Sequence, residues 1–140
     1  MQTERGSSPA SQPRVIVGAA VISGGRVLAC QRADPPETAG RWEFPGGKVE
    51  PGEGEVEALV RECDEELGVR VAVGERVGGD VRLGHGRAVL RVYLARLVDA
   101  GEPEAREHAE LRWLGPHELD TVPWLPADAP IVHALRRYLT

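Results

Sequence analysis

The sequence predicts a single domain of the α/β or α+β class, in which helices cover a mixed β-sheet. Its length of 140 residues suits one hydrophobic core, and a hydrophobic share of 41% is ordinary for a chain that folds unaided. Several segments rich in β-branched residues are separated by turns that contain Gly or Pro, which is typical of strands. Two other segments repeat apolar residues at helical spacing.

The expected elements begin after a polar N-terminal tail. Residues 1–14 carry Ser, Pro and Gly without an apolar period, so we expect disorder there and a domain over residues 15–140. Strands or short extended pieces are expected over residues 15–22, 26–32, 42–44, 69–77, 80–83, 87–98 and 111–114. The first two should form a hairpin around Ser23-Gly24-Gly25. Loops or turns are expected over residues 33–41, 84–86 and 102–110.

Two helices are expected, and the first has the clearer pattern. The residues of its apolar face recur at steps of three or four and are Val56, Leu59, Val60, Cys63 and Leu67. Gly68 follows this face and is a typical C-terminal stop. The second helix is expected over residues 131–139, with an apolar stripe of Ile131, Leu135 and Leu139.

Composition argues against several classes of function. The formal charge is −5, from 17 Lys and Arg against 22 Asp and Glu, which disfavours a nucleic-acid polymer as the partner. The apolar run 15–22 is too short to span a membrane, and residues 1–14 lack the apolar core of a signal peptide, so we expect a cytoplasmic protein. Cys30 and Cys63 lack the spacing of a metal site and are expected to be free, buried thiols.

Acidic residues crowd one flank of the first helix. Glu62, Glu65 and Glu66 fall within an arc of roughly 100° beside the apolar face. Like charges at these spacings destabilise an exposed helix, so we expect a cation to compensate them. Lys or Arg could supply that charge, and a solvated acidic face is the simpler interpretation. Clustered carboxylates without His or Cys are, however, the ligands that Mg²⁺ and Mn²⁺ prefer.

The residues around this helix complete a longer pattern. It runs from Gly47 over five residues to Glu53, then over seven more to Arg61-Glu62-Cys63-Asp64-Glu65-Glu66-Leu67-Gly68-Val69. This pattern resembles the signature of the Nudix hydrolases, with Cys63 where the family usually has an aliphatic residue. The resemblance implies an α/β/α sandwich that uses divalent cations to hydrolyse a nucleoside diphosphate linked to another group.

The same resemblance assigns roles around the metal. It implies that Glu62, Glu65, Glu66 and the carbonyl group of Gly46 bind the ion. Glu53 is implied either as an outer metal ligand or as a partner of Arg61, and we expect Arg61 to orient carboxylates.

Further segments resemble the MutT branch of the family, in particular its CTP and oxidised-nucleotide pyrophosphohydrolases. They are Cys30-Gln31-Arg32, residues 40–50, and Gly101-Glu102-Pro103 with Glu107 and Trp113. By this resemblance Glu107 is a further acid near the metals; the alternative is an exposed loop acid. Residues 124–130 resemble the base-contacting stretch, in which Asp128 is the candidate.

A carboxylate at Asp128 accepts hydrogen bonds, which suits the exocyclic amine of cytosine, although oxidised guanine also presents donors. The alternative is that Asp128 caps the following helix. Phe44 and Leu83 are candidates for apolar contact with the base, or else core residues. Arg32 and Lys48 are candidates for binding phosphate or ribose, or else surface charges.

The expected reaction is attack of water on an inner phosphorus of a nucleoside triphosphate, which releases nucleoside monophosphate and pyrophosphate. Glu65 or Glu107 would accept or steer the proton. The expected substrates are CTP, dCTP, 5-methyl-dCTP or 8-oxo-dGTP, and the role is sanitising the nucleotide pool, in a monomer or homodimer. The alternatives are hydrolysis of ADP-ribose or dinucleoside polyphosphates, and a noncatalytic nucleotide-binding module.

Overall fold

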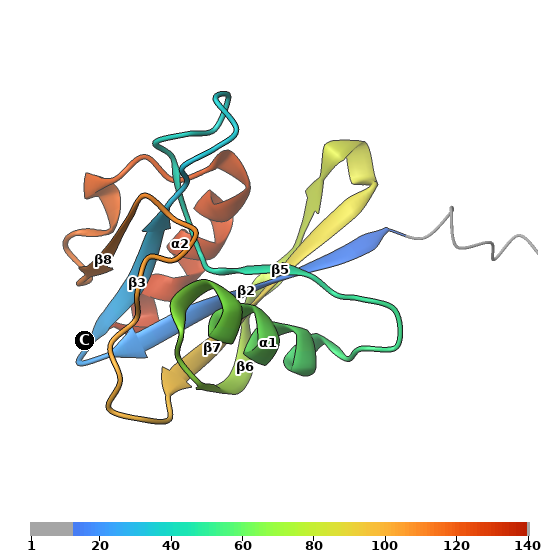
Figure 1. Ribbon diagram of the computed structural model, residues 1–140. Helices are drawn as coiled ribbons and strands as arrows, with labels where there is room; N and C mark the ends of the chain where they lie inside the picture. Colours follow the sequence, from blue (N-terminus) through green and yellow to red (C-terminus); the bar gives the residue numbers. More distant parts are fainter. Residues whose placement is uncertain (1–12, 140) are drawn as a thin grey trace, which may run out of the picture.

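The computed structural model describes residues 13–139, which form a mixed sheet between two helices (Figure 1). The strands are β2 (Arg14–Ser23), β3 (Arg26–Gln31), β4 (Trp42–Glu43), β5 (Gly46–Lys48), β6 (Val71–Leu83), β7 (Ala88–Leu97) and β8 (Glu110–Leu114). The helices are α1 (Glu55–Leu67) and α2 (Ala129–Leu135). The expected tail lies largely outside the described residues, but its last residue, Arg14, already belongs to β2.

Strand β2 lies at the centre of the sheet. The strand order is β4-β3-β2-β7-β6, with β5 also paired to β2 and β8 to β3. The pair β2–β7 is parallel, whereas the other strand pairs are antiparallel. The predicted hairpin of β2 and β3 is confirmed by the pairing of Ile22 with Val27.

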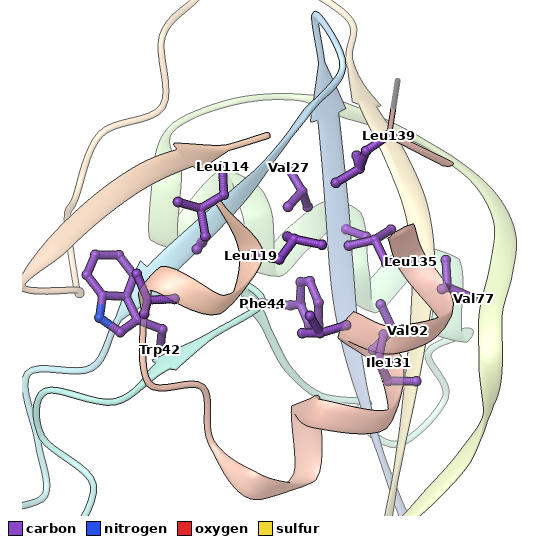
Figure 2. Close-up of a cluster of buried hydrophobic side chains, with 14 of the residues drawn as sticks. Val27, Trp42, Phe44, Val77, Val92, Leu114, Leu119, Ile131, Leu135 and Leu139 are labelled. Atoms are coloured by element: carbon purple, nitrogen blue, oxygen red, sulfur yellow. The ribbon is translucent and has the colours of Figure 1, made fainter. Parts of the chain in front are cut away.

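The two faces of the sheet carry separate cores, which confirms the expected α/β/α sandwich. Along β2, Val17, Ala19 and Val21 pack with the buried side of α1, whereas Ala20 faces the cluster that contains α2. This alternation is the period of two that a strand buried on both faces requires. Figure 2 shows the second cluster, in which Phe44 lies near Ile131 and Leu135.

The segment predicted as two strands, 69–77 and 80–83, forms one long strand, β6. The pairing with β7 shifts register between Val73 and Arg76 and again between Val77 and Val81. Gly78, with a φ of 67°, lies in the second shift. The adjacent glycines Gly78 and Gly79 therefore bend and twist the strand without ending it, as β-bulges do.

Both helices differ slightly from the sequence prediction. In α1, Val56 is 49% exposed, while Ala58 and Glu66 are buried. Gly68 adopts the left-handed conformation expected of a C-terminal stop, with a φ of 69°. Helix α2 is shorter than predicted, since residues 136–138 continue as a 3₁₀ turn, yet Ile131, Leu135 and Leu139 are all buried.

Two further expectations concern cysteines and membranes. Cys30 and Cys63 are free and buried, as predicted. Within residues 13–139, neither helix has the length and apolar character needed to cross a membrane.

Candidate active site

Helix α1 turns two of its acids toward the interior of the protein. Leu59, Cys63 and Leu67 are fully buried against the sheet, and this fixes the rotation of the helix. The side chain of Glu66 is consequently only 8% exposed, and that of Glu62 only 16%. Glu65 points outward, with 53% of its side chain exposed. The three acids of the predicted flank therefore form an inner pair, Glu62 and Glu66, and one outer residue, Glu65.

The glycines of β5 allow the backbone to approach this inner pair. Gly46 has a φ of 154°, and a Cβ atom there would overlap the carbonyl group of Val17. A Cβ atom on Gly47 would overlap the carboxylate of Glu62. The amide nitrogen of Gly46 donates to Glu66 Oε1 over 3.4 Å. These contacts place β5 directly beside the two inner carboxylates.

Arg61 holds Glu53, Glu62 and Glu65 in place. Its guanidinium donates to Glu53 over 2.7 and 3.0 Å, to Glu62 over 3.2 Å and to Glu65 over 3.3 Å. The hydrogen bonds from Arg61 lower the pKa of Glu53 to about 2. Arg61 thus occupies the expected position of a residue that orients carboxylates, and Glu53 is its partner.

The electrostatics of the inner pair favour a cation. Burial, followed by the hydrogen bond and charge of Glu62 and the charge of Glu107, raises the pKa of Glu66 to about 9, although the hydrogen bond from the Gly46 amide lowers it. A divalent ion would relieve this repulsion, and oxygen donors are the ligands that Mg²⁺ prefers. Among residues 13–139, no group of three or more Asp, Glu, His or Cys side chains lies close enough together to hold a metal ion as it stands. Glu62 and Glu66 with the Gly46–Gly47 backbone nevertheless supply donors of the right chemistry, so these residues fit such an ion.

A cleft of about 160 Å³ opens beside this pair. It is lined by Arg32, Ala33, Asp34, Glu43, Gly46, Glu66, Glu107 and His108. The loop between β7 and β8 carries Glu107, which is exposed and reaches the cleft near Glu66. Arg32 donates to Glu43 Oε1 over 2.9 Å and to Thr38 Oγ1 over 3.0 Å. The cleft therefore joins segments that are far apart in the sequence, and it contains predicted metal-site and substrate-site residues together.

Asp128 is buried, with 4% exposed, and does not line this cleft. It occupies the N-cap position of α2, but within the described chain its side chain makes no capping hydrogen bond. Burial raises the pKa of Asp128 to about 7; the nearby Glu43 carboxylate also raises it, and Arg32 lowers it. Its electrostatic neighbours are therefore two cleft residues.

The remaining predicted contacts lie in different places. Phe44 is buried, and its ring centroid lies 5.0 Å from that of Trp124, so it contributes to the core on the α2 side. Leu83, at the end of β6, packs partly against the same core. Lys48 is exposed on β5, where its carbonyl accepts a hydrogen bond from Arg61 over 3.2 Å. Neither Lys48 nor Leu83 lines the cleft that holds Glu66.

Sequence reasoning assigned no role to two residues of the cleft, Glu43 and His108. Glu43 lies inside a segment that indicated the MutT branch, but nothing in its spacing marked its side chain. His108 Nε2 lies 3.0 Å from Glu43 Oε2 and 3.9 Å from Glu66 Oε1. His108 directly follows Glu107, which was predicted to reach the metal site. A loop that brings Glu107 to the cleft also brings the adjacent residue close to it, so His108 could have been named as a candidate.

Comparisons with known proteins match this architecture. The NUDIX domain model matches residues 12–135. A Mycobacterium tuberculosis protein with the provisional name 8-oxo-dGTP diphosphatase 2 is 49% identical over 129 residues, which cover 90% of each chain. The CTP pyrophosphohydrolase of Escherichia coli is 41% identical over 120 residues, covering 85% of this chain and 88% of the relative.

Solved structures give the same result for the fold. The solution structure of the E. coli ORF135 protein aligns with a TM-score of 0.76 at 36% identity and 90% coverage of each chain. A MutT NUDIX hydrolase from Burkholderia pseudomallei aligns with a TM-score of 0.72 at 31% identity, covering 89% of this chain and 98% of that one. The chain belongs to the Nudix family and is a Nudix pyrophosphohydrolase.

Proposed function

We propose that the protein is a Mg²⁺-dependent nucleoside triphosphate pyrophosphohydrolase that acts on cytosine nucleotides, on 8-oxo-dGTP or on both, and so sanitises the nucleotide pool. The observation that carries this proposal is the buried pair Glu62–Glu66, which lies against β5 and borders a cleft shared with Arg32 and Glu107. The names of the relatives agree, since they include an 8-oxo-dGTP diphosphatase and a CTP pyrophosphohydrolase.

Glu62, Glu66 and the Gly46 carbonyl would hold the divalent ion, with Glu65 and Glu107 available from the helix surface and the loop. When bound, Mg²⁺ neutralises phosphate charge and increases the acidity of water. Glu107 is exposed at the cleft, where its carboxylate can accept the proton of the attacking water. Arg32 supplies positive charge for the phosphates. Water attacks an inner phosphorus, the P–O bond to the leaving group breaks, and nucleoside monophosphate and pyrophosphate are released.

The proposal is tested by measuring pyrophosphate release with CTP, dCTP, 5-methyl-dCTP, 8-oxo-dGTP, ADP-ribose and diadenosine polyphosphates, with Mg²⁺ and with excess chelator. We expect turnover of a cytosine or 8-oxo-guanine triphosphate that stops in chelator. Glu66→Gln should lower kcat by more than about 100-fold, because it removes a charged group from the site of charge stabilisation. Asp64→Asn, an exposed position on the same helix, is the matched control.

Each contrary result has a definite meaning. Preference for ADP-ribose or the dinucleotides would replace the proposed substrate class. Failure with all compounds would indicate a noncatalytic binding module. An active Glu66→Gln variant would remove Glu66 from the metal site.

We further propose that Asp128 reads the base. Its support is a buried carboxylate near Arg32 and Glu43 that makes no capping bond within the described chain. Asp128→Asn adds an N–H donor, so the ratio of kcat/KM for dCTP to that for 8-oxo-dGTP should fall by roughly 10-fold, the value of one or two hydrogen bonds. An unchanged ratio would contradict the base-reading role.

A further inference from the structure

His108 is inserted into the cleft by a loop that is fastened on both sides of it. Before it, the amide of Glu104 donates to the Leu67 carbonyl over 2.9 Å, and the amide of Arg106 to the Glu66 carbonyl over 3.3 Å. After it, the amide of Ala109 donates to the Gln31 carbonyl over 2.8 Å. These bonds leave the imidazole 6% exposed, although the neighbouring Glu107 is exposed.

The ring lies between two carboxylates that belong to different elements. Its Nε2 atom is 3.0 Å from Glu43 Oε2 on β4 and 3.9 Å from Glu66 Oε1 on α1. An ionised carboxylate only accepts hydrogen bonds, so Nε2 carries the proton and donates to Glu43. The other oxygen of Glu43 accepts from Arg32 over 2.9 Å. Glu43 is thus held by one donor on each side.

The other ring nitrogen argues against a role in packing alone. Among the described residues, His108 Nδ1 is buried without a hydrogen-bond partner. An apolar side chain of similar size would fill this space without leaving a polar atom unpaired. The contact that distinguishes histidine from such a side chain is the hydrogen bond from Nε2 to Glu43.

We infer that His108 is a positioning residue for the metal site. It holds the Glu43 carboxylate toward Arg32 and apart from Glu66, so that Glu66 stays available to a divalent ion. Without His108, the Glu43 carboxylate would bring a second negative charge beside Glu66. Arg32 would then lose its partner Glu43. This inference rests on the proposed function, because it assigns the divalent ion to Glu66.

The test compares His108→Leu with His108→Gln. Leucine fills space without a donor, whereas glutamine retains a side-chain N–H. We measure the Kd of Mn²⁺ for the nucleotide-free protein, together with kcat, KM and Tm. His108→Leu should weaken Mn²⁺ binding by about 10-fold, the scale on which residues behind the metal ligands affect affinity. His108→Gln should recover most of that loss. His133→Leu, at an exposed position of α2, is the matched control and should bind Mn²⁺ like the wild type.

A second comparison tests whether His108 acts through Glu43. In a Glu43→Gln background, His108→Leu should weaken Mn²⁺ binding much less than it does in the wild type, because the carboxylate that it restrains is gone. Equal effects in the two backgrounds would overturn the inference.

The remaining outcomes separate this inference from the proposed function. Unchanged Mn²⁺ affinity in His108→Leu overturns the positioning role, and so does an equal loss in the Leu and Gln variants, because packing then explains the effect. If the wild type binds Mn²⁺ with the expected pattern but hydrolyses none of the triphosphates, only the proposed function fails. If the wild type binds no Mn²⁺, both fail.

Discussion

Gly46 and Gly47 are adjacent glycines that serve different purposes. At Gly46 a side chain would meet the backbone of Val17, which cannot move without disturbing the central strand. At Gly47 a side chain would meet the carboxylate of Glu62. That carboxylate can move aside, but it then leaves its place beside Glu66. The first glycine is thus required by the fold and the second by the site.

Alanine substitutions should separate these two roles. Gly46→Ala should lower the free energy of unfolding by about 2 kcal/mol or more, because backbone strain and overpacking add. Gly47→Ala should leave this free energy within about 1 kcal/mol of the wild type but weaken Mn²⁺ binding by roughly 10-fold through displacement of Glu62. Chemical denaturation and Mn²⁺ titration of both variants provide the check. Equal effects of the two substitutions on stability would contradict this division.

Because of Asp128, the free energy of unfolding depends on pH, and this contribution can be measured separately from those of other groups. Burial raises the pKa of Asp128 from an ordinary value of 3.8 to about 7, so the folded state binds this proton more tightly than the unfolded chain. Its stabilising contribution is complete below pH 3.8 and is lost as the pH rises toward 7.

Relative to Asp128→Asn, the wild type should therefore lose about 2 to 3 kcal/mol of unfolding free energy between pH 5 and pH 8. Guanidinium denaturation of both proteins at each pH measures this difference. Glu66 is present in both proteins, so its own titration cancels. Parallel pH profiles would show that Asp128 is ionised in the folded protein over the whole interval.

Sequence reasoning located single residues well where a motif fixed their spacing. Glu62, Glu66 and Gly46 meet in the structure because a helix and a short strand place them predictably. Glu43 and His108 escaped notice because their meeting depends on the path of the loop between β7 and β8. No local pattern describes that path, which is set by hydrogen bonds to Glu66, Leu67 and Gln31.

At the scale of elements, α1 is attached to the sheet at its first turn as well as by its apolar face. Glu55 accepts a hydrogen bond from the Tyr93 hydroxyl over 2.5 Å and pairs with Arg91 Nη1 over 2.5 Å, both on β7. Glu57 accepts from the amide of Gly54 over 2.8 Å and caps the helix. The attachment through Glu55 thus adds polar contacts between β7 and the helix that carries Glu62 and Glu66.

Removing this attachment should destabilise the protein measurably. We expect Tyr93→Phe to cost about 1 kcal/mol and Glu55→Ala about 2 kcal/mol, with a double variant that costs less than their sum because the two side chains share one bond. Thermal and chemical denaturation measure these values. Tyr138→Phe is the control, since among residues 13–139 that hydroxyl accepts a hydrogen bond only from the exposed Arg137. Additive losses would show that the Tyr93–Glu55 bond contributes little.

The elements themselves were largely predictable, and the errors have physical causes. Periodicity identified α1 and Gly68 marked its end, but Val56 was assigned to the apolar face although it is 49% exposed. The Gly78-Gly79 pair suggested a break, yet pairing along the whole of β7 keeps β6 continuous. In β6, pairing with a neighbouring strand overrode a local signal.

At the scale of the whole molecule, the acidity of the chain and its buried acids point to stabilisation by divalent ions. Any ion that binds the folded state alone raises the free energy of unfolding, by about 2.7 kcal/mol at a concentration 100 times its Kd. For a domain of this size this corresponds to a rise in Tm of roughly 10 °C.

Mg²⁺ should therefore raise the Tm of the wild type, and Glu66→Gln should lose most of this rise. Differential scanning calorimetry with MgCl₂, and with NaCl at the same ionic strength, measures the effect. An equal rise with both salts would mean that general screening of charge is responsible.

The pattern of elements predicted a layered domain in which helices cover a mixed sheet, and the resemblance to the Nudix hydrolases implied the α/β/α order of its layers. Beyond the β2–β3 hairpin, the sequence did not predict that β2 would also pair with β5 and β7, or that β2 and β7 would be parallel. The β2–β7 pairing joins segments far apart in the chain, since Arg14 is the partner of Ala88, and many registers satisfy the same pattern of apolar residues.

The separation of the two cores has a consequence for how substrate choice can diverge. The acids of α1 rest on one core, whereas Phe44 and the residues around Ile131 belong to the other, and the two clusters are made of different residues. On the proposed base-reading role of Asp128, substitutions in the stretch before α2 would alter which nucleobase is accepted while the core beneath α1 keeps its packing. A gene duplicate of this protein would need few changes to acquire a new preference.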